Sequence, residues 1–219
     1  MPEVHKYSPS WPVYGLNWSN RPGSFRLGIS SFITDLTNKI KIIQLSSNGE
    51  LVQIAETEHD FPVTKLLWAP PKSGLAPDLL ATTGEYFRIW ELVNPDIGSD
   101  EDHPLICRAS LGNSKKIGKQ ENCSPISSFD WNDFDSNMCI TSSVNTTCTV
   151  WDLEVYLYLM KTLVPRTQLI AHDSEVYDIS FTVGTHGFAT VAKDGSLRMF
   201  DLRLMLTLMQ IAGIFNNSI

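Results

Sequence analysis

A pattern of short apolar segments and aromatic residues occurs four times along the chain and limits the folds open to it. Each copy has an apolar segment ending in an aromatic residue, a second segment of small residues, a tight turn, and a third segment that closes, in most copies, with an aromatic and an acidic residue. The first aromatic and the third-segment position lie 19 to 25 residues apart in every copy. Repetition of this kind is typical of folds in which each unit is one small sheet. The first aromatics are Trp18, Trp68, Trp131 and Phe181, and the third-segment positions are Ile43, Trp90, Trp151 and Phe200.

Alternation within these segments predicts strands rather than helices. The side chains of residues 87–92 and 147–151 alternate between two faces with a period of two, which is the period of a β-strand. No stretch keeps a 3.6-residue apolar period over twelve residues. Asp194-Gly195 is a strong hairpin signal, and Asn145 falls at the matching turn of the preceding unit. We therefore predict an all-β chain of four-stranded units with little helix.

Composition and charge argue against several classes of protein. The 219 residues include 17 Lys and Arg against 24 Asp and Glu, a net charge of −7, so a broad surface for binding nucleic acid directly is not expected. The chain has no run of about 18 apolar residues, and we expect no membrane span and no secretion signal. Its four cysteines form no C-x-x-C pair, which favours a reducing compartment.

Common catalytic and cofactor motifs are missing or wrongly spaced. The segment from Gly112 to Lys119 resembles a P-loop, but five residues separate its glycines and Gln120 follows the lysine. The acidic cluster from Asp96 to Asp102 lacks the glycine and the terminal glutamate of a calcium loop. We therefore predict no catalytic, cofactor-binding or metal-binding residue, and a protein that is not an enzyme.

The repeated pattern resembles the WD-repeat β-propeller, whose blades have four strands and a Trp-Asp pair at the end of the third. The resemblance implies an all-β propeller with about four blades present, an incomplete ring. The pairs at this position are Trp151-Asp152, Trp90-Glu91, Phe200-Asp201 and Ile43-Gln44, of which only the first is complete.

The resemblance also implies a buried hydrogen-bonded network in each blade. Its members are a His before the first strand, a Ser or Thr in the second, an Asp in the turn and the third-strand Trp. In the fourth unit His172, Thr190 and Asp194 match three of these positions, and Phe200 cannot supply the indole N–H. The network of this unit is therefore expected to be incomplete. Trp90 and Trp151 match the last position in the second and third units.

Six strings in order place the resemblance within one WD-repeat subfamily, over about residues 5 to 203. It comprises the plant Transparent Testa Glabra and anthocyanin regulators and the animal cullin-associated factor that binds dual-specificity Tyr-regulated kinases. The resemblance implies a non-enzymatic scaffold without a cofactor, in cytoplasm and nucleus. The partners it implies are MYB and basic-helix-loop-helix transcription factors or a dual-specificity protein kinase. The strings are TKLLWAP, PDLLATTGEYFRIWEL, SSFDWND, TTCTVWDLE, TQLIAHDSEVYDISF and KDGSLRMFDLR.

The resemblance ends after Arg203. Members of the subfamily have about seven blades, so we expect a partial propeller over residues 1–203 and a divergent apolar tail over residues 204–219. We interpret the chain as a truncated form of such a propeller, with a short isoform as the alternative.

A second partner hypothesis concerns the sequence FDLR at residues 200–203. It is similar to the W-D-x-R signature by which some WD-repeat proteins dock the adaptor of cullin-RING ubiquitin ligases. Asp201 and Arg203 are therefore candidate partner-binding residues, because an Arg presents a charged fork suited to a carboxylate. The alternative is an ordinary salt bridge at the rim of a blade.

The tryptophans of the repeats are expected to be buried between blades. Trp11 lies outside the repeats and is the aromatic we expect to be exposed. The tryptophans expected to be buried are Trp18, Trp68, Trp90, Trp131 and Trp151.

Overall fold

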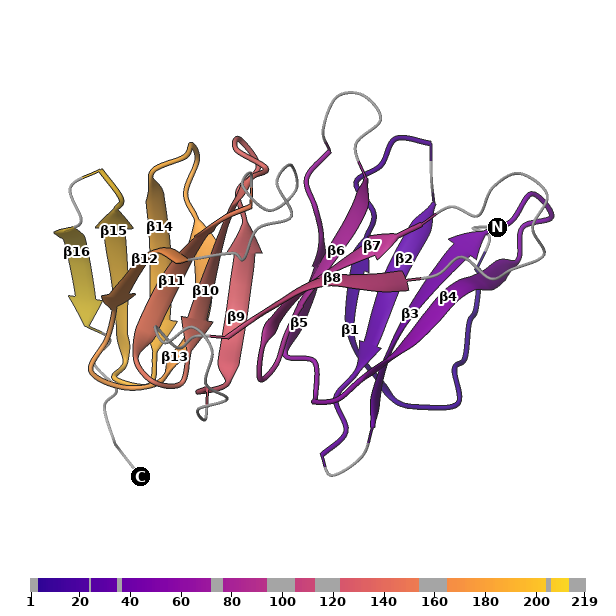
Figure 1. Ribbon diagram of the computed structural model, residues 1–219, viewed down its shortest axis with the longest axis horizontal. Helices are drawn as coiled ribbons and strands as arrows, with labels where there is room; N and C mark the ends of the chain where they lie inside the picture. Colours follow the sequence, from indigo (N-terminus) through magenta and orange to yellow (C-terminus); the bar gives the residue numbers. More distant parts are fainter. Residues whose placement is uncertain are drawn as a thin grey trace. The chain divides into compact units, whose positions relative to one another are not determined.

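All regular structure in the described part of the chain is β-strand (Figure 1). The computed structural model describes residues 4–23, 25–34, 37–71, 77–93, 105–112, 123–153 and 165–203, and the backbone alone of 206–212. Within these ranges the strands form four sheets of four strands each. The prediction of an all-β fold made of four four-stranded units is therefore confirmed. The chain divides into two compact units, Met1–Ser110 and Leu111–Ile219.

The first unit contains two sheets in which the strands follow one another in sequence order. Pairing is antiparallel from β1 to β4 and from β5 to β7. Sheet 1 contains β1 (Val13–Trp18), β2 (Arg26–Ser31), β3 (Asn38–Leu45) and β4 (Leu51–His59), and sheet 2 contains β5 (Lys65–Trp68), β6 (Asp78–Thr83), β7 (Phe87–Leu92) and β8 (Leu105–Leu111).

The second unit repeats this arrangement, with antiparallel pairing between successive strands in each sheet. Sheet 3 contains β9 (Ile126–Trp131), β10 (Met138–Ser143), β11 (Thr147–Asp152) and β12 (Pro165–Ile170), and sheet 4 contains β13 (Val176–Phe181), β14 (Gly187–Ala192), β15 (Ser196–Asp201) and β16 (Leu206–Ala212).

Part of the segment expected to be a divergent tail belongs to sheet 4. Strand β16 pairs with β15 from Asp201↔Leu206 to Ser196↔Ala212. The segment carries no charged residue between 206 and 212. Its backbone provides partners for the outer edge of β15, which would otherwise present unpaired N–H and C=O groups.

Close packing between the sheets of the first unit requires a glycine on β2. A Cβ atom at Gly28 would lie 3.1 Å from Leu66 Cδ2 and 3.2 Å from Trp68 Nε1. Glycine therefore leaves the room into which the Trp68 indole fits against β2. The apolar core of this unit includes Ile40, Ile42, Leu66, Trp68, Leu80 and Trp90, and that of the second unit includes Ile140, Val150, Val176, Ile179, Phe188 and Phe200.

The expectation that all the repeat tryptophans are buried is wrong for Trp18. Trp68, Trp90, Trp131 and Trp151 are buried, but Trp18 is 53% exposed. It shares one face of β1 with Tyr14 and Leu16, which are exposed as well. Asn17 points the other way, toward Trp68 of sheet 2. Burial at this repeat position thus depends on a neighbouring sheet, which covers the Asn17 face of β1 and leaves the Trp18 face open.

Trp11, the aromatic expected to be exposed, is half-buried. Its ring centroid lies 5.7 Å from Lys41 Nζ, within the range of a cation–π contact. Its indole Nε1 is buried without a hydrogen-bond partner in the described structure.

Two hairpin turns of the second unit share one geometry. Asp194 Oδ1 accepts hydrogen bonds from the Ser196 amide (2.9 Å) and hydroxyl (2.6 Å). Asn145 Oδ1 accepts from the Thr147 amide (3.3 Å) and hydroxyl (2.6 Å) in the same way. The residue after each acceptor is left-handed, with φ of 75° at Gly195 and 73° at Thr146.

Candidate functional site

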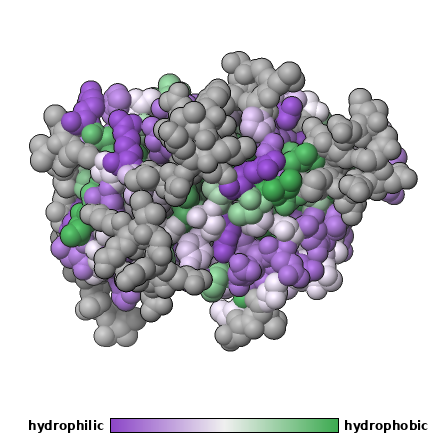
Figure 2. Space-filling view, viewed as in Figure 1, coloured by the Kyte–Doolittle hydropathy of each residue, from purple (hydrophilic) through white to green (hydrophobic). Residues whose placement is uncertain are grey.

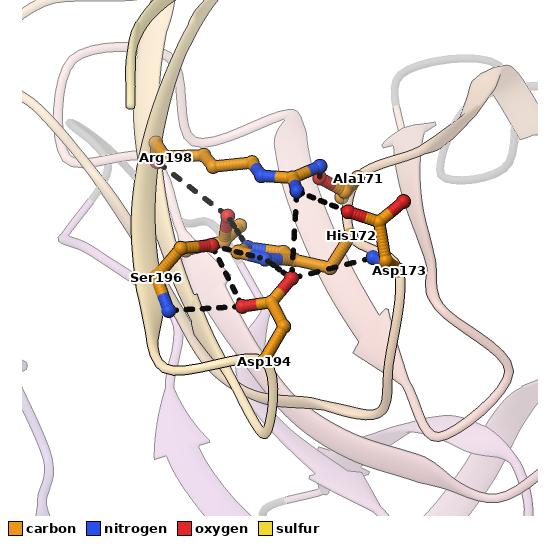
Figure 3. A network of polar contacts seen from close by, with 7 residues as sticks. Ala171, His172, Asp173, Asp194, Ser196 and Arg198 are labelled. Carbon is orange, nitrogen blue, oxygen red and sulfur yellow. Dashed lines mark hydrogen bonds and ion pairs between the residues drawn. The ribbon is translucent and has the colours of Figure 1, made fainter. Parts of the chain in front are cut away.

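A buried polar network anchors sheet 4, and Figure 3 shows its labelled members converging from the β12–β13 connection, from the β14–β15 turn and from β15. His172 Nδ1 lies 2.9 Å from Asp194 Oδ2, and His172 Nε2 lies 2.7 Å from Thr190 Oγ1. Because an ionised carboxylate only accepts, Nδ1 carries a hydrogen and donates to Asp194. The Ser196 hydroxyl lies 3.2 Å from His172 Nδ1. The three residues that the resemblance assigned to this network thus lie in direct contact.

Arg198 completes the network from β15. Its Nη1 donates to the carbonyl oxygen of Ala171 (2.9 Å), and its Nη2 lies 2.5 Å from Asp173 Oδ2 and 3.5 Å from Asp194 Oδ2. The arginine therefore ties both residues flanking His172 to the third strand of the sheet. No sequence argument above singled out Arg198.

Electrostatics keep Asp194 ionised. Burial alone would raise the pKa of its carboxyl group, but hydrogen bonds from the Ser196 hydroxyl and amide, from His172 and from the Asp173 amide together lower it well below its usual range. The His172 side chain is buried. Both ring nitrogens are engaged inside the protein, so the geometry suits a structural clamp rather than a general base.

Phe200 replaces the indole donor in this sheet, as the sequence indicated. It stacks on Phe188, with ring centroids 4.9 Å apart and planes at 12°. In sheets 2 and 3 the tryptophan at the same register position reaches the second-strand threonine. Trp90 Nε1 donates to Thr82 Oγ1 (2.8 Å), and Trp151 Nε1 donates to Thr141 Oγ1 (3.0 Å).

Sheet 2 contains a second histidine network, which the sequence analysis missed. His59 Nδ1 lies 2.6 Å from the carbonyl oxygen of Phe61, and Nε2 lies 3.2 Å from Thr82 Oγ1 and 3.3 Å from Arg88 Nη1. Arg88 Nη2 also pairs with Asp60 at 3.2 Å. Since Arg88 can only donate, Nε2 of His59 accepts and Nδ1 donates to the carbonyl.

The two histidine networks have the same plan and a shared sequence signal. A His-Asp pair precedes the first strand, at 59–60 and at 172–173, and an Arg lies two residues before the third-strand aromatic, at 88 and at 198. The structure joins the Asp of each pair to that Arg. In sheet 1 the positions equivalent to the second-strand threonine and the third-strand aromatic hold the buried apolar residues Ile29 and Ile43.

The environment of His59 favours its neutral form. Burial is the main reason that its pKa falls from 6.5 to about 4; the charge of Arg88 acts in the same direction, and the hydrogen bond to Phe61 opposes both. Because both of its ring nitrogens are bonded inside the protein, His59 has a structural role.

Asp201 and Arg203 form a local ion pair at the end of β15. The Arg203 Nε lies 3.0 Å from Oδ1 and 3.1 Å from Oδ2 of Asp201, its Nη2 also bonds Oδ2, and its amide donates to Oδ1 at 2.8 Å. The hydrogen bonds from Arg203 lower the pKa of Asp201 to about 2. Asp201 is buried, whereas the Arg203 side chain is 66% exposed. The structure thus holds an exposed guanidinium in a fixed position.

Comparison with known proteins shows which proteins this chain is similar to. It is 38% identical over 212 residues to an uncharacterized WD repeat-containing protein of Schizosaccharomyces pombe and 36% identical over 214 residues to a WD repeat-containing protein of Saccharomyces cerevisiae. The homologues of this chain are WD-repeat proteins. A further relative, at 46% identity over 204 residues, is the DDB1- and CUL4-associated factor 7 homolog of Dictyostelium discoideum. No family model matches the chain.

These WD-repeat relatives are longer than the chain. The three matches cover 91%, 92% and 93% of this chain but 57%, 46% and 38% of the relatives. The chain therefore spans about half the length of the curated relatives it matches.

The described residues of the chain hold no group of three or more His, Cys, Asp or Glu side chains placed to bind a metal ion. In the same part of the chain no helix is long and apolar enough to cross a membrane.

Proposed function

We propose that this WD-repeat chain belongs to a non-enzymatic scaffold that brings other proteins together. The observation that carries the proposal is its 46% identity, over 91% of the chain, to a relative whose name describes it as associated with other proteins. The polar clusters around His59 and His172 support it, because their ring nitrogens are engaged within the sheets. A scaffold acts by docking partner segments on one surface, which raises their effective concentration.

The partners proposed are MYB and basic-helix-loop-helix transcription factors or a dual-specificity protein kinase, and the proposed location is cytoplasm and nucleus. The test is affinity purification of the tagged chain from cell extract, followed by mass spectrometry. Recovery of a kinase or a transcription factor, lost after heat denaturation of the bait, is the expected result. A folded bait that recovers neither class would exclude this proposal.

A second candidate is a substrate receptor of a cullin-RING ubiquitin ligase. The observation that favours it is the exposed guanidinium of Arg203, which Asp201 fixes in position. The variant Arg203→Ala should lose co-precipitation of the cullin adaptor. Lys193→Ala, which removes another exposed charge of sheet 4, should retain it. Adaptor recovery that survives Arg203→Ala would remove this candidate.

A further inference from the structure

A groove with a cationic end lies beside β12 in the second unit. Two cavities of about 190 and 260 Å³ share Thr167 and Leu202 in their walls. We call them together the β12 groove, lined by residues 166–170 on one side and 200–203 on the other. The volume of each is sufficient for one bulky apolar side chain, since an apolar cavity of about 150 Å³ can hold benzene.

The groove follows the edge of a sheet. Strand β12 is an end strand of sheet 3 (Figure 1). Consecutive residues of a strand point to opposite faces, yet four consecutive residues from Thr167 to Ile170 line the larger cavity. The cavity therefore runs along the edge of β12 rather than over one face. An edge of this kind suits an extended peptide segment.

The smaller cavity combines apolar walls with positive charge. Met138, Val150 and Leu202 provide apolar surface, and Arg166, His186 and Arg203 lie around it. None of the described residues that line this cavity is acidic. Arg166 is exposed and forms no ion pair with any residue that the structure describes. Asp201 engages Nε and Nη2 of Arg203, and Nη1 has no hydrogen-bond partner among the residues that the structure describes.

The charge of this end differs from that of the chain as a whole. The chain carries a net charge of −7, and hydrophilic and hydrophobic side chains are intermingled over the surface visible in Figure 2. A local cationic end on an acidic protein steers an acidic partner to that place and disfavours its binding elsewhere.

We propose that the β12 groove binds an acidic, extended peptide segment of a partner protein, with a bulky apolar residue in the smaller cavity and carboxylates on Arg166 and Arg203. The proposal rests on the scaffold function and names the chemistry of one partner segment. Ile170, 78% exposed at the other end of the groove, offers further apolar contact along the same line.

The probe for this site is a fluorescein-labelled decapeptide with one Phe flanked by Asp and Glu, titrated with the full chain in fluorescence anisotropy. We expect a dissociation constant below about 100 μM. It should rise at least about tenfold when Gln replaces the acidic residues of the peptide or when Ser replaces its Phe. Arg166→Glu should weaken binding about tenfold. Lys193→Glu, an exposed charge reversal that does not line the groove, should change it less than about twofold.

A further variant tests the cavity rather than its charge. Thr167→Trp fills the groove and leaves all charges in place, so it should weaken binding of the probe as strongly as Arg166→Glu does. Thermal melts matching that of the unmodified chain show that each variant is folded. Absence of probe binding, equal binding of the Gln peptide, or equal effects of Arg166→Glu and Lys193→Glu would overturn the proposal.

The outcome separates this inference from the scaffold function. If the unmodified chain and Arg166→Glu recover the same partners from extract and neither binds the probe, the groove is not a peptide site, but the scaffold function stands. If the chain binds the probe but recovers no kinase or transcription factor, the peptide site is supported and those two partner classes are excluded.

Discussion

Asp130 Oδ2 accepts a hydrogen bond from the Phe181 amide at 2.7 Å, joining the first strand of sheet 3 to the first strand of sheet 4. Asn17 Oδ1 accepts from the Trp68 amide at 2.8 Å and joins sheets 1 and 2 in the same way. In both cases the acceptor precedes an aromatic of its own strand, and the donor lies 51 residues later. Neighbouring sheets in both units are thus held by the same polar link from one first strand to the next.

Removing this link should destabilise the second unit. Asp130→Ala leaves the Phe181 amide without its acceptor, and we expect a loss of about 1–2 kcal/mol in the free energy of unfolding. Asp130→Asn keeps one oxygen acceptor and should lose less. The measurement is urea unfolding, with Asp133→Ala as the control for loss of an exposed carboxylate. Equal midpoints for Asp130→Ala and Asp133→Ala would contradict the prediction.

The stacked pair Phe188 and Phe200 replaces a different pair in sheet 2, where Leu80 lies opposite Trp90. Phe200→Trp alone adds volume against Phe188 and should cost about 1–3 kcal/mol. The double variant Phe188→Leu, Phe200→Trp makes room for the indole, whose N–H can then reach Thr190. We expect it to recover most of that loss, measured as a coupling free energy in a double-mutant cycle. Additive effects of the two substitutions would show that the exchange is not a packing pair.

Acid should destabilise the protein through His59. Its pKa in the folded protein, about 4, lies below the ordinary value of 6.5. As the pH falls, His59 is therefore protonated in the unfolded chain before it is protonated in the folded one. Stability from this group is therefore complete above about pH 6.5 and falls by about 3 kcal/mol as the pH drops to about 4. The lowered pKa values of Asp194 and Asp201 affect stability only at lower pH, below about 4.

The measurement is the urea midpoint between pH 7.5 and 4.5. His59→Gln removes the titrating group and should flatten the dependence, whereas His186→Gln, at an exposed histidine, should retain it. An unchanged slope in His59→Gln would assign the acid sensitivity to other groups.

Thr146 adopts a left-handed backbone that a β-branched residue tolerates poorly. Its carbonyl oxygen accepts hydrogen bonds from the Ala171 amide (2.9 Å) and the His172 amide (3.3 Å), so the turn is held in place by the segment that follows β12. Thr146→Gly should raise the free energy of unfolding by about 0.5–1 kcal/mol, and Thr146→Ala should raise it less. Differential scanning calorimetry of the three proteins is the test, and a lower melting temperature for the glycine variant would count against strain at this turn.

Local signals account for the parts of the fold that were predicted from the sequence. Period-two alternation and the turn residues Asp194 and Asn145 indicate strands and hairpins, because both act through neighbours in the chain. The contacts among His172, Thr190 and Asp194 match the pattern that the resemblance implied, because these residues keep their places relative to the strand ends.

The sequence did not indicate the network around His59. Its Nδ1 bonds the backbone carbonyl of Phe61, and a pattern of side chains does not reveal such a partner.

The sequence by itself determined the secondary structure of this protein, its division into repeats and the residue types available to each sheet. Only the tertiary structure decided which surfaces meet: Asp130 bonds Phe181, and Trp18 lies exposed while Trp68 is buried. The physical reason is that burial and hydrogen bonding between sheets depend on surfaces brought together from residues about fifty positions apart. A strand pattern specifies its own two faces but not the partner that covers each of them.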